Sequence, residues 1–203
     1  MGGPFVTLVR HSETEWSKAG RHTGATDLDL TAAGEAQAVA LRPLLARAYD
    51  LVLVSPMRRA QRTADLAGCS DGSVNLDTVQ ELREWDYGTL EGLTTREIQE
   101  RFLDWSIWTG PWPGGETAAE VGARADAVIE RLLQTGDDAR VLVVAHGHIL
   151  RVLAARWLGL EVARGRLLAL DTATVSELGW EHASRVLRRW NQAPLGAADA
   201  RPG

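Results

Sequence analysis

Short apolar runs, rich in β-branched residues and bounded by polar or turn-forming residues, recur along the chain. Such runs are typical of strands buried on both faces, and they lie at residues 5–9, 51–54, 74–76 and 141–145. Two later candidates cover 167–170 and 174–178. Because helical patterns separate the first four runs, we expect a largely parallel sheet with helices on both faces, a three-layer α/β/α fold.

Residues that favour helix starts occupy the connections between these strands. Four helices are expected, with N-terminal signals at Thr31, Ser55, Thr117 and His146. Ser55 precedes Pro56, the arrangement of an N-cap followed by proline at the first helical position. Thr117 and Glu120 form a capping box. We expect these helices to extend to about residues 45, 67, 132 and 159.

One region, residues 78–116, lacks a regular pattern. It carries several tryptophans and a Pro-Gly group, and we expect it to form an excursion with one or two helices. The length of 203 residues suits one domain, which we place at residues 1–191. Residues 192–203 are rich in Ala, Pro, Gly and Asp and are expected to form a flexible tail.

Charge and composition narrow the classes of partner. The net charge is −5 and no basic run occurs, which argues against nucleic acid or an acidic membrane as the main partner. No apolar run approaches the roughly 20 residues of a membrane span, and the N-terminus has no signal-peptide pattern. We therefore expect a cytoplasmic protein. The single cysteine, Cys69, has no Cys or His neighbour at metal-ligand spacing.

Histidine and arginine follow three of the predicted strands. In open α/β sheets ligands bind beyond the carboxyl ends of the strands. Those positions hold Arg10, His11, Ser55, Arg58, Arg59, Arg62, His146, Gly147 and His148. A single Arg-His pair after a strand usually has no function, but the joint occurrence at three strand ends favours a phosphate site. Arginine forks and a helix N-terminus both bind phosphate oxygens.

The same set of residues allows covalent catalysis. A neutral imidazole can attack phosphorus and carry the group as phosphohistidine, and nearby positive charge favours the neutral form. No P-loop, dinucleotide-binding or serine-hydrolase motif is present. Asp27 and Asp29 lack a matching run of metal ligands. We therefore expect neither a metal nor a cofactor.

The strand-end residues belong to longer blocks that resemble the histidine phosphatase superfamily, in its phosphoglycerate mutase-like branch. In chain order the blocks are 8–16, 21–24, 27–34, 55–64, 82–92 and 144–147. The resemblance implies that His11 is the nucleophile and that Arg10, Arg59 and His146 hold the phosphoryl group. It implies that Glu84 donates a proton to the leaving oxygen and later activates water.

Further residues take substrate-binding roles by the same resemblance: Thr23, Gly24, Gly147 and His148. The chain departs from the family at Ser12, where glycine is usual, and at Ser17, where mutases have an asparagine that touches phosphate. We assign Ser17 to phosphate binding with shorter reach. His148 stands where mutases have asparagine.

The resemblance leaves open whether the chain is a hydrolase or a mutase. Mutases of the family bind a second anionic group through a basic cluster in the excursion, but residues 105–116 contain no arginine or lysine. The tryptophans there could form an apolar wall of the site or simply pack. We expect a phosphomonoester hydrolase of the acid phosphatase type, with a phosphoglycerate mutase and a non-catalytic phospho-ligand binder as alternatives. Small phosphorylated metabolites are the expected partners, and a homodimer is considered because mutase-like relatives often pair.

Overall fold

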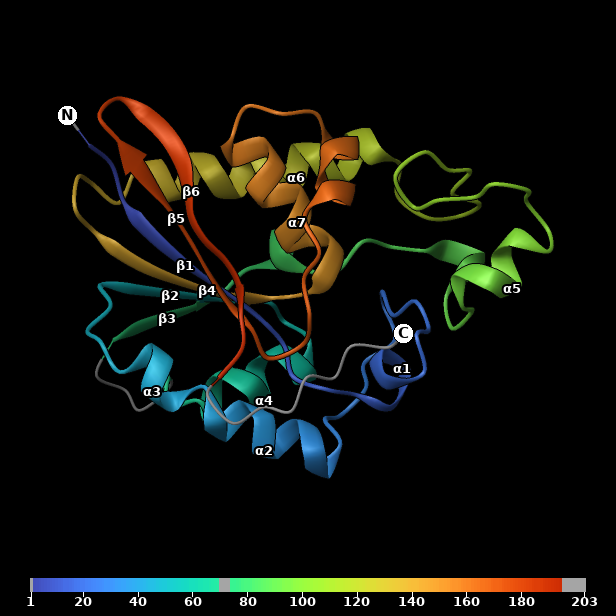
Figure 1. The fold of residues 1–203 in the computed structure, drawn as a ribbon, viewed down its shortest axis with the longest axis horizontal. Helices are drawn as coiled ribbons and strands as arrows, with labels where there is room; N and C mark the ends of the chain where they lie inside the picture. Colours follow the sequence, from blue (N-terminus) through green and yellow to red (C-terminus); the bar gives the residue numbers. More distant parts are fainter. Residues whose placement is uncertain (1, 70–73, 195–203) are drawn as a thin grey trace.

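The computed structural model describes residues 2–69 and 74–194, which form one six-stranded sheet in the order β3-β2-β4-β1-β5-β6 (Figure 1). The strands are β1 Phe5–Arg10, β2 Leu51–Val54, β3 Asn75–Thr78, β4 Arg140–Ala145, β5 Val175–Glu181 and β6 Ser184–Gln192. The first four are mutually parallel, whereas β5 and β6 are antiparallel to their neighbours. The expected largely parallel α/β sheet is confirmed.

Helices cover both faces of this sheet. Their bounds are α1 Glu15–Lys18, α2 Ala32–Ala40, α3 Arg42–Leu45, α4 Arg58–Leu66, α5 Thr95–Gln99, α6 Ala118–Leu133 and α7 Gly147–Trp157. Short 3-10 helices are η1 Gln80–Leu82, η2 Gly88–Leu90 and η3 Val162–Leu167. In Figure 1, α6 and α7 lie on one face and α2, α3 and α4 on the other. No helix in the described part of the chain is long and apolar enough to cross a membrane.

Side chains at alternate positions along the strands pack into two separate hydrophobic cores, one on each face of the sheet. Val6, Leu8 and Val143 pack on the face covered by α6 and α7. Val9 and Val144 pack on the opposite face, against α3 and α4. Since each buried Val or Leu side chain contributes roughly 1.5–3 kcal/mol, both faces of the central strands stabilise the fold. This two-sided burial explains why the central strands are continuously apolar.

Thr31 is the N-cap of α2 as predicted, but the extent of that helix and the predicted start at Ser55 differ from the structure. The helix after Thr31 breaks after α2 because Pro43, within α3, has no backbone N–H to continue the ladder. Ser55 is not an N-cap: Met57 occupies that position and α4 begins at Arg58. The Ser55 hydroxyl instead lies 2.7 Å from Nε2 of His146. The predicted capping box at Thr117 is confirmed.

The late strands were predicted only in part. Residues 167–170 do not form a strand: Leu167 is the last residue of the 3-10 helix η3, and residues 168–170 follow it. The 174–178 candidate corresponds to β5. Strand β6 was missed because it is a half-exposed edge strand with several arginines and has no continuous apolar run. The short third strand lies at Asn75–Thr78, shifted from 74–76.

The domain boundaries remain predictions, with one local correction. Gln192, placed in the tail, is the last residue of β6. Residues 195–203 of the predicted tail lie outside the described residues.

The excursion extends from the carboxyl edge of the sheet, and its tryptophans are packed. It contains α5 and two 3-10 helices, η1 and η2. Trp85, Trp105 and Trp108 are buried. The indole N–H groups of Trp85 and Trp105 donate to the backbone carbonyls of Glu116 and Pro111, both at 2.8 Å. These side chains therefore stabilise the excursion, and the packing alternative is the better description of them.

Candidate active site

The register of the parallel strands places the carboxyl ends of β1, β2 and β4 at the same edge of the sheet. Arg10 pairs with Ala145 across β1 and β4, and Val54 pairs with Val144 across β2 and β4. The residues that follow, His11, Ser55 and His146, therefore meet at one edge of the sheet. The ring centroids of His11 and His146 are 5.1 Å apart.

His11 is held as a neutral imidazole with a defined proton position. Its Nδ1 lies 2.8 Å from the Ser12 carbonyl oxygen, which only accepts hydrogen bonds, so Nδ1 carries the proton. Burial, followed by the charges of Arg59 and Arg10, lowers the pKa of His11 well below 6.5. Nε2 is consequently the unprotonated nitrogen, which is the atom a nucleophile requires.

His146 is enclosed between two side chains. Arg59 donates from Nε to Nδ1 of His146 at 3.1 Å, so Nε2 carries the proton of the neutral ring and donates to Ser55. The ring is fully buried, and burial with the charge of Arg59 lowers its pKa well below 6.5. Its tautomer is therefore opposite to that of His11.

Arg59 is the arginine of α4 that lies in the site. It is completely buried, and its guanidinium donates to the carbonyls of Thr26, Gly24 and Thr23 at 2.9, 3.1 and 3.3 Å. Arg58 is 58% exposed and pairs with Asp27. Arg62 is about half exposed and pairs with Glu35. The structure thus separates one buried arginine, Arg59, from two at the surface.

Arg10 retains an unused donor beside the histidines. Its Nη1 donates to the Leu170 carbonyl, while its Nε is buried and has no partner among the described residues. A Cβ at Gly147 would lie 3.2 Å from that Nε, so glycine permits the close approach. An unpartnered buried cationic donor is costly, and an incoming anion removes the cost.

Glu84 lies at the N-terminus of α7. Its Oε1 accepts the backbone N–H groups of Trp85 and Ile149, and its Oε2 accepts that of His148, all at 2.9 Å. The side chain is only 7% exposed. Glu84 therefore caps the helix that follows His146, and its negative charge raises the pKa of Arg10 and Arg59 against the larger effect of their burial.

The predicted substrate residues contribute mainly through their backbones. Thr23 and Gly24 support Arg59 through their carbonyls, and the Gly24 N–H donates to Oε1 of Glu91 at 3.1 Å. Ser17 completes a capping box with Thr14: its hydroxyl accepts the Thr14 N–H and donates to the Thr14 carbonyl. The phosphate contact of Ser17 stays a prediction, since it requires that hydroxyl to leave the cap.

Sequence reasoning missed Arg151. It lies on α7, three residues after His148 and so on the same helix face. Its guanidinium carbon is 4.6 Å from the centroid of the Trp108 ring, and its Nε donates to the Gly165 carbonyl at 3.1 Å. The i, i+3 spacing from His148 was the available signal. A further cation thus stands at the rim of the site.

No group of three or more metal-type side chains occurs within residues 2–69 and 74–194.

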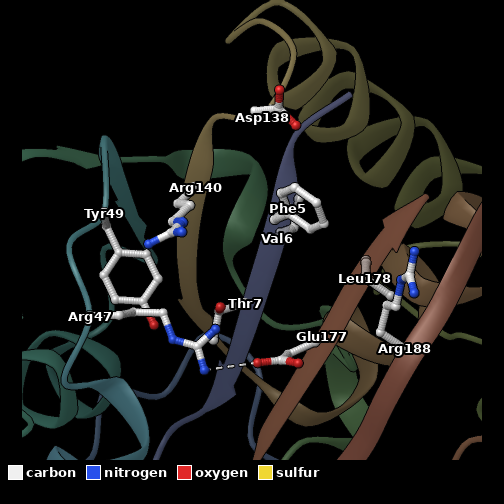
Figure 2. Close-up of a pocket in the computed structure, with 10 residues that line it drawn as sticks. All are labelled: Phe5, Val6, Thr7, Arg47, Tyr49, Asp138, Arg140, Glu177, Leu178 and Arg188. Carbon is white, nitrogen blue, oxygen red and sulfur yellow. Dashed lines mark ion pairs between the residues drawn. The ribbon is translucent and has the colours of Figure 1, made fainter. Parts of the chain in front are cut away.

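A separate surface pocket of about 660 Å³ opens at the other end of the sheet, where β1 and β4 begin (Figure 2). Its lining includes Phe5, Tyr49 and Arg140, and Glu177 there is ion-paired to Arg47 at 3.0 Å. This pocket has no histidine, so it lacks the nucleophile found at the carboxyl edge.

Comparisons with known proteins show which family the chain matches. A family model described as histidine phosphatase superfamily (branch 1) matches residues 6–193. An acid phosphatase from Mycobacterium tuberculosis is 42% identical over 185 residues, covering 90% of this chain and 89% of the relative. A sedoheptulose 1,7-bisphosphatase from Saccharomyces cerevisiae is 37% identical, covering 79% of this chain and 70% of the relative.

The fold has a close counterpart among solved structures. The structure of an open reading frame product from Mycobacterium tuberculosis superposes with a TM-score of 0.88 at 41% identity, covering 94% of this chain and 98% of that one. The likeness therefore extends over nearly the whole chain.

Proposed function

The chain belongs to the histidine phosphatase superfamily and is a phosphatase, and on that premise we propose that it hydrolyses phosphomonoesters through a phosphohistidine on Nε2 of His11. One observation carries the proposal. The unprotonated Nε2 of a buried neutral imidazole stands beside Arg10, whose Nε has no partner in the described part of the chain. A nucleophile and an unused cationic donor are the two groups that attack on a phosphate ester requires.

In the first step the lone pair of His11 Nε2 attacks phosphorus. The bond from phosphorus to the ester oxygen breaks, and that oxygen takes a proton from Glu84 and leaves as an alcohol. Arg10 and Arg59 neutralise charge on the transferring group.

In the second step a water molecule attacks the phosphohistidine. The Glu84 carboxylate takes a proton from that water, the N–P bond breaks, and inorganic phosphate and neutral His11 are released. Arginine supplies the charge neutralisation that a metal supplies in other phosphatases, so we propose that no metal takes part.

We favour hydrolysis over mutase chemistry. Residues 105–116 supply no arginine or lysine for a second phosphate, and relatives named as probable phosphoglycerate mutases share only 31% identity. Trp85 and Trp105 pack within the excursion, so the preference for transfer to water rests on the missing basic cluster.

A second candidate concerns the substrate. Arg151 places a cation at the rim, with its guanidinium stacked on Trp108. This position suits a phosphate ester that carries a second anionic group, and a relative is named as a sugar bisphosphatase. The candidate class is a bisphosphate or a phosphorylated carboxylic acid, cleaved at one ester only.

The remaining parts of the proposal concern the setting. We propose small phosphorylated metabolites as substrates, a cytoplasmic location and a single catalytic domain over residues 1–191. The net charge of −5 supports metabolites over nucleic acid or acidic membranes as partners. A homodimer is proposed from the behaviour of mutase-like relatives.

Phosphorus NMR tests the reaction. The protein is incubated with 3-phosphoglycerate and a trace of 2,3-bisphosphoglycerate, and in parallel with a sugar bisphosphate and a sugar monophosphate. We expect inorganic phosphate to grow in the wild type, with no growth in His11→Ala. Formation of 2-phosphoglycerate with little free phosphate would establish a mutase. Turnover retained in His11→Ala would exclude the phosphohistidine route.

A further inference from the structure

His148 occupies an aromatic cage beside the proposed acid. Its ring centroid lies 5.3 Å from that of Trp108, 5.9 Å from that of Tyr87 and 6.0 Å from that of His22. Its Nδ1 is 3.8 Å from Oε2 of Glu84, which accepts the backbone N–H of the same residue. The ring therefore lies next to the carboxylate that the proposed function assigns to protonation of the leaving oxygen.

The ring carries a single proton. Burial, with the charges of Arg151, His22 and Arg10, lowers the pKa of His148 well below 6.5. A neutral imidazole has one nitrogen that donates and one that accepts, and a neighbouring hydrogen bond decides which is which.

The hydroxyl of Tyr87 determines which ring nitrogen of His148 carries the proton. Its hydroxyl oxygen lies 2.6 Å from Nδ1 of His148, and this is the only hydrogen bond of the hydroxyl within the described residues. Burial, followed by the charge of Glu84, raises the pKa of Tyr87 well above 10, so the phenol keeps its proton. If Nδ1 of His148 carried the ring proton, the buried hydroxyl proton of Tyr87 would have no acceptor, which costs free energy. That cost is avoided when Nδ1 is unprotonated and accepts the hydrogen bond from the hydroxyl.

The other ring nitrogen is then a donor without a partner. Nε2 of His148 has no hydrogen bond to the described residues, and the side chain keeps 18% of its surface exposed. Since Nδ1 faces Tyr87, Nε2 points away from it. The donor is thus available to a ligand in the site.

We propose that Tyr87 is a positioning residue that holds the ring proton of His148 on Nε2, so that His148 donates a hydrogen bond to a hydroxyl or carboxylate oxygen next to the ester oxygen. The part of this proposal that concerns the substrate rests on the proposed function. It assigns a preference for phosphate esters of hydroxylated or carboxylated aliphatic alcohols over esters of plain phenols, which have no such oxygen.

Nitrogen-15 NMR of the imidazoles tests the tautomer and needs no turnover. We expect His148 of the wild type to carry its proton on Nε2, and Tyr87→Phe to give a mixture of tautomers. Tyr49→Phe is the matched control, because Tyr49 is the other tyrosine of the chain and lines the pocket at the opposite end of the sheet (Figure 2). A proton on Nδ1 in the wild type, or no change in Tyr87→Phe, overturns the proposal.

Kinetics test the consequence for the substrate. The ratio of kcat/KM for glycerol 3-phosphate to that for phenyl phosphate is measured in both tyrosine variants. We expect Tyr87→Phe to lower the ratio about twofold, mainly through KM, because an even mixture of tautomers halves the population of His148 that carries its proton on Nε2. Tyr49→Phe should leave the ratio at its wild-type value. An equal loss on both esters in Tyr87→Phe counts against the proposal.

A second pair of variants covers the case in which Tyr87→Phe is unstable. His148→Gln retains a side-chain N–H donor, whereas His148→Leu has none. We expect the ratio to be higher in the glutamine variant than in the leucine variant, and equal ratios overturn the donor role. Absence of phosphate release from either ester by the wild type would instead count against the proposed function, with the NMR result unaffected.

Discussion

Nε of Arg59 donates to Nδ1 of His146 at 3.1 Å, and this bond joins α4 to the turn between β4 and α7. Burial first, and then the charge of Arg59, lowers the pKa of His146 well below 6.5, so the ring is neutral. The same guanidinium holds the carbonyls of the 23–26 loop. Arg59 is therefore both a charge in the site and the connection between three segments.

The two arginines at the start of α4 are expected to differ sharply. Arg59→Ala should lower kcat/KM by about a hundredfold or more, because it removes a preorganised cation and four hydrogen bonds at once. Arg58→Ala is the control, since Arg58 is 58% exposed and its surface ion pair contributes little. Steady-state kinetics on a soluble ester measures both. A severe Arg58→Ala with a mild Arg59→Ala would show that the assignment of the two residues is reversed.

Two buried serines are expected to affect stability in opposite directions. The Ser12 hydroxyl is buried without a partner among the described residues, so Ser12→Ala should leave the free energy of unfolding unchanged or raise it by about 1 kcal/mol. Ser55→Ala should lower it by about 1–3 kcal/mol, because the buried Nε2–H of His146 loses its acceptor. Urea denaturation at neutral pH measures both. A clear loss of stability in Ser12→Ala would mean that its hydroxyl has a partner in solution.

Histidine titration should make the protein less stable in acid. Burial lowers the pKa of His11, His146 and His148 well below 6.5, and that of His22 to about 4. As the pH falls below 6.5, the unfolded chain binds protons that the folded protein does not, so the unfolded state gains stability. The loss begins near pH 6.5 and continues toward the folded-state pKa values.

Each such histidine contributes a slope of up to about 1.4 kcal/mol per pH unit in that window. Denaturation at pH 7.5, 6 and 5 should therefore give steadily lower free energies of unfolding. The variant His22→Gln should flatten the dependence, since glutamine does not titrate. A free energy that is flat between pH 7.5 and 5 would contradict the buried neutral state of these rings.

Removal of metal should have no effect on turnover. The described residues contain no group of three or more metal-type side chains, and Arg10 and Arg59 supply the positive charge. Dialysis against EDTA followed by assay in chelator should preserve the full rate. Recovery of a lost rate by added Mg²⁺ or Zn²⁺ would show that a metal takes part.

Much of the site followed from local sequence. The run Val141–Ala145 is apolar throughout, so its place in a buried strand and the position of His146 at its carboxyl end were both readable. The same reasoning failed for β6, whose edge position leaves one side open to solvent and permits arginines. It also misplaced Ser55, because the hydroxyl that suits an N-cap equally suits a histidine on a neighbouring strand.

The sequence by itself determined the parallel core strands, the residues at their carboxyl ends and the family. These depend on local periodicity and on motifs that any one segment carries whole. Only the tertiary structure decided which nitrogen of His11, His146 and His148 is protonated. It also decided that Nε of Arg10 is unpartnered among the described residues and that Tyr87 contacts His148. The physical reason is that a hydrogen bond forms only when donor and acceptor are placed to within a few tenths of an ångström. These donors and acceptors come from segments far apart in the chain, and no local sequence pattern encodes their separation.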